Sequence, residues 1–124
     1  MRPMHAWLSM AMFCFSTAAV AQQQLTIVTS FQKDLTEVYK RAFEARNPGV
    51  KVEVLSRGTS AAIAYVREAP ANNKPDIFWA SAPDAFEVLA SENLLQKFDG
   101  RNPAVPAKIG NYPINDPEGF YYGQ

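Results

Sequence analysis

The chain has 124 residues, with twelve acidic and twelve basic side chains and a formal net charge of zero at pH 7. The two signs are interspersed along the chain. The sequence has no basic face or stripe of the kind typical of nucleic-acid-binding proteins, which argues against that class. Its single cysteine, Cys14, excludes an internal disulfide framework.

The N-terminus has the parts of a secretory signal. An apolar run from 8 to 15 follows Arg2, and small residues suited to cleavage end at Ala21. The run is shorter than the roughly 20 residues that a membrane-spanning helix needs. We therefore expect 1–21 to be a cleaved signal peptide and 22–124 to be exported to the periplasm.

Cys14 invites an alternative, a lipid-anchored N-terminus. The bulky Phe13 precedes it, where lipoprotein signals carry a small residue, so cleavage after Ala21 is the preferred interpretation. That cleavage also removes His5, the only histidine. The exported chain then has no cysteine or histidine, and we expect its stability to come from a packed core.

A strand and a helix open the exported chain. Residues 25–29 are rich in β-forming side chains, and from Asp34 onward apolar residues recur at spacings of three and four. This spacing predicts an apolar stripe packed against a core, formed by Leu35, Val38, Tyr39, Ala42 and Phe43. The breakers in 47–49 end the helix.

Two further strand–helix pairs follow. Alternation over 50–55 predicts a strand, and a second helix with Ile63 and Val66 inward ends near Pro70. Residues 76–80 predict a short buried strand, and a third helix then places three side chains inward, Phe86, Leu89 and Ala90. This order predicts an α/β fold with a mainly parallel sheet and flanking helices. From Asp99 onward prolines interrupt any regular pattern.

Ligands of open α/β sheets bind beyond the carboxyl ends of the strands, where helix N-termini present unpaired N–H groups. The turns that occupy this place begin at Thr29, Arg57 and Ser81. They supply hydroxyls, a glycine and a cation, which suit an anionic or strongly polar solute. The candidate ligand-binding residues are Ser30, Phe31, Arg57, Gly58, Thr59, Ser60, Ser81 and Asp84.

Each of these residues also has a structural interpretation. The hydroxyls and Asp84 are typical helix N-caps, and Arg57 alone is typical of a solvated surface side chain. Phe31 and Trp79 suit either a ring-stacking role or the core. The agreement of three turns at one sheet edge favours the functional interpretation.

The stretch from Leu25 to about Phe98 resembles the N-terminal lobe of periplasmic solute-binding proteins of bacterial ABC importers. The subgroup it resembles includes ferric-ion, hexose-phosphate, phosphonate and thiamine binders. The most specific features are "FEARNPGVKVEV", the "GTS" turn, and "PDIFWAS" leading to "LLQKF". Weaker similarity continues through "EGFYYGQ".

The resemblance implies a periplasmic-binding-protein-like fold of type II, in which a hinge joins two lobes around a solute cleft. Members run to roughly twice this length or more, as two domains of ordinary size require. We therefore expect 22–124 to be an incomplete N-terminal lobe with the second lobe missing, and the chain to be a fragment, marginally folded on its own. The expected partners are a small solute and an ABC permease in the inner membrane, with no cofactor and a monomeric state.

Ferric binders of this family carry a histidine after the first strand and an acid after the third. Gln32 and Ser81 stand at those places, so the resemblance predicts no metal site. The family's paired tyrosine ligands belong to the second lobe, and we interpret Tyr121 and Tyr122 as strand or core aromatics.

Two alternatives stay open. A periplasmic sensing module for a membrane receptor has the same first lobe. A secreted hydrolase would have to rely on Ser with Lys or on two carboxylates such as Asp76 and Asp84, which lie at opposite ends of the predicted third strand. There is no G-x-S-x-G nucleophile motif, so the sequence favours a binding protein over an enzyme.

Overall fold

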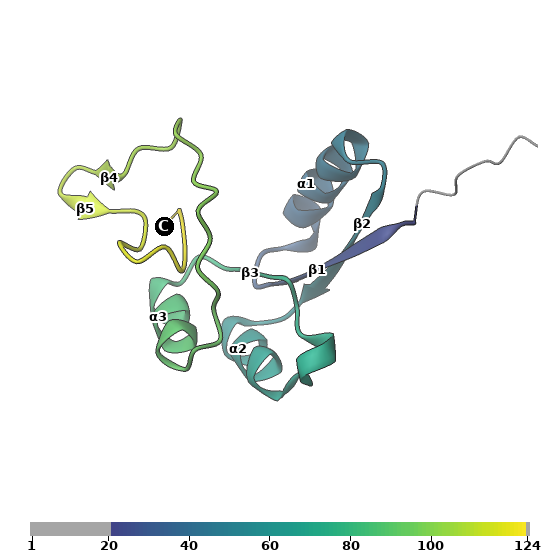
Figure 1. Ribbon diagram of the computed structural model, residues 1–124, viewed down its shortest axis with the longest axis horizontal. Coiled ribbons are helices and arrows are strands. Elements are labelled where there is room, and N and C mark those ends of the chain that lie inside the picture. The colour runs from purple at the N-terminus through teal and green to yellow at the C-terminus, as the bar shows by residue number, and fades with distance from the viewer. Residues whose placement is uncertain (1–20, 124) are drawn as a thin grey trace, which may run out of the picture.

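The computed structural model describes residues 21–123, so the predicted signal peptide lies outside the described residues except for Ala21. The elements follow the predicted alternation of strand and helix (Figure 1). They are β1 (Gln23–Thr29), α1 (Lys33–Arg46), β2 (Val50–Ser56), α2 (Thr59–Glu68), the 3-10 helix η1 (Ala71–Asn73), β3 (Ile77–Trp79), α3 (Pro83–Ser91), β4 (Lys108–Ile109) and β5 (Tyr112–Pro113).

The main sheet has the strand order β2-β1-β3, and both pairings are parallel. Thr29, the last residue of β1, pairs with Ser56 on one side and with Trp79 on the other. All three strands therefore end at the same level and at the same edge. The predicted α/β class with a mainly parallel sheet is confirmed.

The core lies between the sheet and the two helices α2 and α3. Val28 is fully buried and pairs with Leu55 and Phe78, whose side chains share its face of the sheet. This face packs on the fully buried Ala62 and Leu89. Because side chains alternate along a strand, the neighbouring residues Ile77 and Trp79 must point to the opposite face.

An exposed ion pair joins α2 to the end of α3. Arg67 donates from Nε to Glu92 Oε2 at 2.7 Å and from the guanidinium to the other carboxylate oxygen. The hydrogen bond lowers the pKa of Glu92 below its ordinary value and raises the pKa of Arg67 above its own. Since both side chains are solvated, the pair contributes little to stability.

The prediction that the α1 stripe packs against a core is wrong. Tyr39 is 58% exposed and Val38 is 56% exposed, and Leu35 and Phe43 are also open to solvent. The only buried residue of α1 is Thr36. The physical reason is that α1 packs on β2, while β3 is only three residues long and brings no second helix to that face. The third strand is likewise less buried than predicted, because Ile77 is 41% exposed.

The segment after α3 is more ordered than its prolines suggest. A hairpin pairs β4 with β5, and Ile114 after it is buried. Tyr121 packs on Phe86 of α3 with ring centroids 5.3 Å apart, and the Tyr122 hydroxyl donates to the Phe98 carbonyl. These contacts give both tyrosines structural roles, in line with their sequence interpretation.

Candidate functional site

The three turns predicted to face a ligand lie together at the carboxyl edge of the sheet. The Ser30 amide donates to the Trp79 carbonyl at 3.3 Å, which ties the first turn to the end of β3. The Arg57 amide donates to the Thr29 carbonyl at 2.9 Å and ties the second turn to the end of β1. The backbone thus brings the three turns to one edge, and Asp84 follows the third turn in the first turn of α3.

The alternative that these side chains serve as helix caps does not hold. The N-cap positions of α1, α2 and α3 are Gln32, Gly58 and Ala82, and none makes a side-chain capping bond. Thr59 and Ser60 lie inside the first turn of α2, where they leave its terminal N–H groups uncapped. Uncapped first-turn N–H groups carry the positive end of the helix dipole, which favours an anion.

Arg57 is held in place without being neutralised. Its guanidinium carbon lies 4.6 Å from the ring centroid of Tyr65 in α2, a cation–π contact. Among residues 21–123, the one ion pair joins Arg67 to Glu92, so no carboxylate compensates the Arg57 charge. An exposed cation with a fixed direction is therefore present at the sheet edge.

Gly58 is not demanded by the local backbone. Its φ of −59° is open to any residue, and an added Cβ would meet no atom within 4 Å. A glycine at this position is consequently compatible with close approach of a ligand to the backbone, and a larger side chain there would not strain the fold.

The described residues include no group of three or more histidine, cysteine, aspartate and glutamate side chains that would hold a metal ion. Gln32, at the place of the ferric binders' histidine, is an exposed N-cap residue, and Ser81 is exposed. Apart from Phe31 and the carboxylate of Asp84, the side chains of Gln32 and of the candidate residues are amide, hydroxyl and guanidinium groups, which bind oxyanions and hydroxyls.

One aromatic side chain was missed as a candidate by sequence reasoning. Tyr39 contacts Trp79 at a centroid distance of 5.3 Å, and Trp79 contacts Phe31 at 5.0 Å. The apolar spacing of α1 assigned Tyr39 to the core, and only its large exposure shows otherwise. Phe31 thus lies in a ring cluster beside the turns and not in the α2–α3 core.

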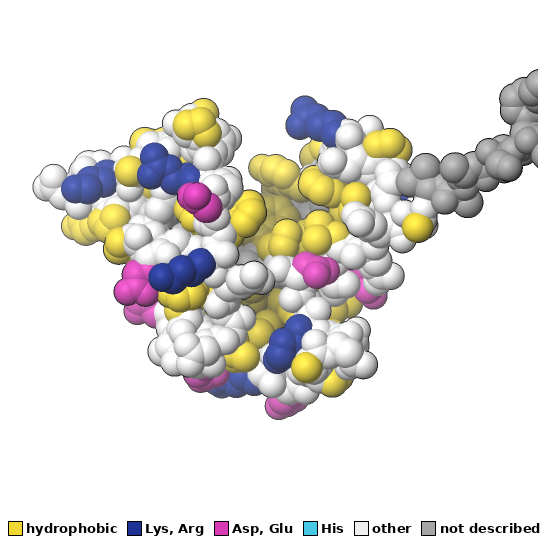
Figure 2. Space-filling view, in the orientation of Figure 1, with side chains coloured by type: hydrophobic (Ala, Val, Ile, Leu, Met, Phe, Trp, Pro, Cys, Tyr) yellow, Lys and Arg dark blue, Asp and Glu magenta, His cyan; other side chains and the backbone are white. Residues whose placement is uncertain are grey.

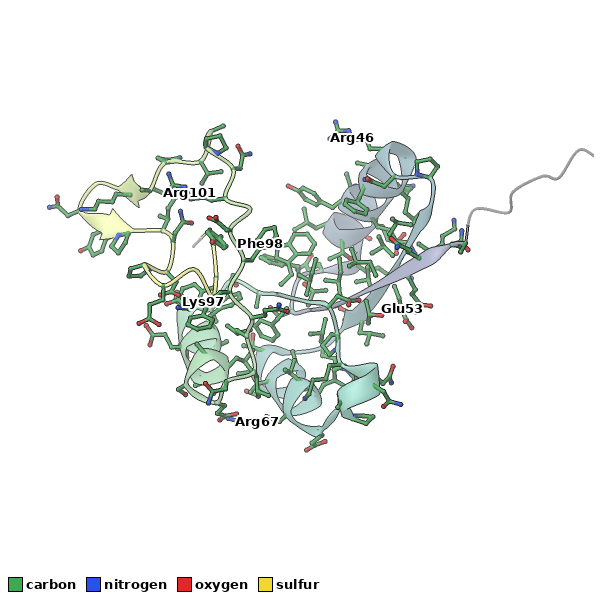
Figure 3. The ribbon with its side chains drawn as sticks, viewed as in Figure 1. Arg46, Glu53, Arg67, Lys97, Phe98 and Arg101 are labelled. Atoms are coloured by element: carbon green, nitrogen blue, oxygen red, sulfur yellow. The ribbon has the colours of Figure 1, made fainter. Side chains whose placement is uncertain are left out.

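Two hollows of the described residues lie elsewhere. One of about 830 Å³ lies between Lys97–Arg101 and the β4–β5 hairpin, and one of about 370 Å³ lies between α3 and the segment around Asp116–Tyr121. Figure 3 shows Lys97 and Arg101 on this side of the molecule. Neither hollow is lined by a candidate residue, and acids and bases are mixed in the larger one.

The two carboxylates of the hydrolase alternative are separated by the length of β3. Asp76 precedes the strand, and its Oδ2 accepts a hydrogen bond from the Thr26 amide at 2.8 Å. Asp84 lies beyond the other end of the strand. Asp76 therefore has a structural partner and does not converge with Asp84 as a catalytic pair must.

The fold is that of one lobe of a periplasmic binding protein. The family model described as bacterial extracellular solute-binding protein matches residues 24–123, and the chain belongs to this family. It is a family of binding proteins, in agreement with the preference for binding over catalysis. None of the described helices has the length and apolar character needed to span a bilayer.

A solved structure with the same fold is the IdiA/FutA protein of Trichodesmium in complex with iron and citrate ligands. The TM-score is 0.63 at 18% sequence identity, with 81% of this chain and 30% of that chain covered. The chain thus spans about a third of the length of this neighbour and corresponds to one lobe. Comparison with curated protein sequences gives no match.

Proposed function

We propose that the chain captures a small polar or anionic solute in the periplasm and delivers it to an ABC-type permease. The observation that carries the proposal is the convergence of three turns at the carboxyl edge of the sheet. At this edge the helix N-termini lack side-chain caps, and Arg57 has no carboxylate partner. Membership of a solute-binding family supports the same conclusion.

An anion suits these groups better than a neutral solute. The positive end of α2 and the guanidinium of Arg57 both stabilise negative charge, and Thr59 and Ser60 offer hydroxyl donors beside them. The Trichodesmium protein is described with citrate among its ligands, which makes a carboxylate a natural first choice beside phosphate and phosphonate. Gln32 and Ser81 are poor ligands for iron, so the proposal does not include a bound metal ion.

The proposal includes export and domain organisation. Residues 1–21 would direct the chain to the periplasm and be removed, and residues 22–124 would form part of the N-terminal lobe. The site as described is open, and a small-molecule site normally encloses most of its ligand. A second lobe that closes over the site would enclose more of the solute surface and hold the solute more tightly.

Isothermal titration calorimetry with four probes tests the proposal: phosphate, methylphosphonate, citrate and glycerol at one ionic strength. At least one of the three anions should bind with measurable heat, and glycerol should bind more weakly. Ser60→Ala should lower the affinity for the anion by about tenfold, because it removes one hydrogen bond to a charged group.

Ser91→Ala is the matched control, because Ser91 is also exposed but lies at the far end of α3. It should leave the anion affinity unchanged. The absence of heat with all three anions, from a chain that melts cooperatively, contradicts the proposed function.

A further inference from the structure

Three aromatic rings from different elements form a continuous surface next to the candidate site. Phe31 comes from the turn after β1, Tyr39 from α1 and Trp79 from the end of β3. Trp79 is the central ring, with its centroid 5.0 Å from Phe31 at an interplanar angle of 48° and 5.3 Å from Tyr39 at 83°. We call these three side chains the aromatic wall.

The aromatic wall lies on the face of the sheet that α2 and α3 do not cover. Val28 and Phe78 point into the core under those helices, so the alternation of side chains directs Trp79 to the opposite face. On that face α1 covers β2 but leaves the β3 side open, and Tyr39 and Ile77 remain 58% and 41% exposed. Solvent therefore reaches the wall.

The space-filling view shows a deep hollow between α1 and the C-terminal segment, with hydrophobic side chains gathered on the α1 side (Figure 2). Phe98 projects toward this hollow from the segment after α3 (Figure 3) and is 65% exposed. Apolar side chains thus face the hollow from two sides, although only the aromatic wall adjoins the strand ends.

Polar groups lie within one or two residues of these rings. Ser30 precedes Phe31, and its amide is bonded to the Trp79 carbonyl. The Ser56 hydroxyl donates to the Phe31 carbonyl at 3.4 Å, and Ser81 follows Trp79 by two residues. A ligand whose polar group meets these hydroxyls therefore has its remaining atoms next to aromatic faces.

We propose that the site selects anions that carry a planar aromatic ring, with the ring packed on the aromatic wall and the anionic group at the turns. The inference rests on the proposed function and narrows its solute class. Planar rings make offset or edge contacts with aromatic side chains that saturated groups of the same size make less well. The wall is already assembled by its own ring contacts, so little side-chain freedom is lost when a ring binds.

Three phosphonates with one head group test the inference: methylphosphonate, cyclohexylphosphonate and phenylphosphonate. Calorimetry on the intact chain, purified in soluble form, gives their relative affinities. We expect phenylphosphonate to bind about tenfold more tightly than methylphosphonate. Cyclohexylphosphonate should fall between them, because it has the apolar bulk but not the planar face.

Tyr39→Leu examines the wall itself, and Tyr112→Leu is its matched control. Both tyrosines are well exposed, at 58% and 79%, so neither substitution removes core packing, and Tyr112 lies in β5 away from the wall. Tyr39→Leu should reduce the preference for phenylphosphonate over methylphosphonate severalfold. Tyr112→Leu should leave this preference unchanged, and Trp79→Phe should keep part of it.

The outcomes separate the inference from the proposed function. Equal affinities for the methyl and phenyl compounds overturn ring selection and leave the anion site intact. A preference for phenylphosphonate that Tyr39→Leu leaves undiminished in folded protein places the ring elsewhere and also overturns ring selection on the wall. If none of the three phosphonates binds, ring selection is overturned, and the anion site at the turns fails as well only if phosphate and citrate also give no heat.

Discussion

Replacing Arg57 by glutamine removes a charge at the sheet edge that no carboxylate balances within the described residues. The guanidinium stands over Tyr65 at 4.6 Å, so its direction is set before any solute arrives. A hydrogen bond to a charged group is worth about 1.5–3 kcal/mol. Arg57 is exposed, and salt screening at physiological ionic strength favours the lower end of that range. We therefore expect anion affinity to fall about tenfold.

The cost to the fold should be small. Arg57→Gln loses the contact with Tyr65, which is worth about 0.5–1 kcal/mol at an exposed site. The matched control is Arg46→Gln, because Arg46 is an exposed arginine at the last turn of α1, far from the strand ends (Figure 3).

Calorimetry at two salt concentrations provides the assay. Wild-type affinity should weaken as salt rises, and the affinity of Arg57→Gln should weaken less, because part of the charge interaction is already gone. Equal anion affinities for wild type, Arg57→Gln and Arg46→Gln would refute the assignment of Arg57 to the site.

Three further substitutions test the site, the core and the ion pair. Gly58→Ser should change the free energy of unfolding by only about a few tenths of a kcal/mol, because an added Cβ meets no atom within 4 Å. It should nevertheless lower anion affinity severalfold, because the larger side chain blocks the approach of the anion to the backbone. Unchanged anion affinity would contradict close contact between the anion and this backbone. Leu89→Ala should lower the free energy of unfolding, measured by urea denaturation, by about 3 kcal/mol because Leu89 is fully buried. Leu35→Ala, at a 42% exposed position, should lower it by less than about 1 kcal/mol. Equal losses for the two variants would show that the core is misplaced. Arg67 lowers the pKa of Glu92, so the pair stabilises the fold above the ordinary pKa of 4.5, and this contribution is lost as the pH falls through the lowered value. The melting temperature of wild type should therefore slightly exceed that of Glu92→Gln at neutral pH, and the two should converge in acid. A difference in melting temperature that widens in acid would contradict the stabilising role of the ion pair.

The sequence predicted the elements that carry strong local signals. The breakers at 47–49 and the alternation over 50–55 located the first helix and the second strand, and the structure begins α1 one residue before the predicted Asp34. The order of elements then predicted a parallel sheet, and the structure confirms it. In a parallel sheet the three turns that follow the strands lie at one edge.

Burial was harder to predict because it depends on neighbours that periodicity does not reveal. The α1 stripe has the spacing of a core-facing helix, but the face of the sheet beside it is only partly covered. The pairing of Tyr39 with Trp79 joins residues 40 positions apart and has no local signal. Only the structure could exclude the capping alternative, because hydroxyl residues are typical N-caps whereas the observed N-caps of α2 and α3 are Gly58 and Ala82.

The backbone amides at the three turns give the most direct test of the central claim, that solute binds at the carboxyl edge of the sheet. Two-dimensional ¹H–¹⁵N spectra of the chain, recorded as phosphonate or citrate is added, report on each of these amides. The account predicts that the largest shift changes fall on Ser30, Arg57, Gly58 and Ser81 and that β4 and β5 stay unchanged. Shift changes confined to the hollow beside Lys97 and Arg101, or none anywhere in a folded chain, would contradict it.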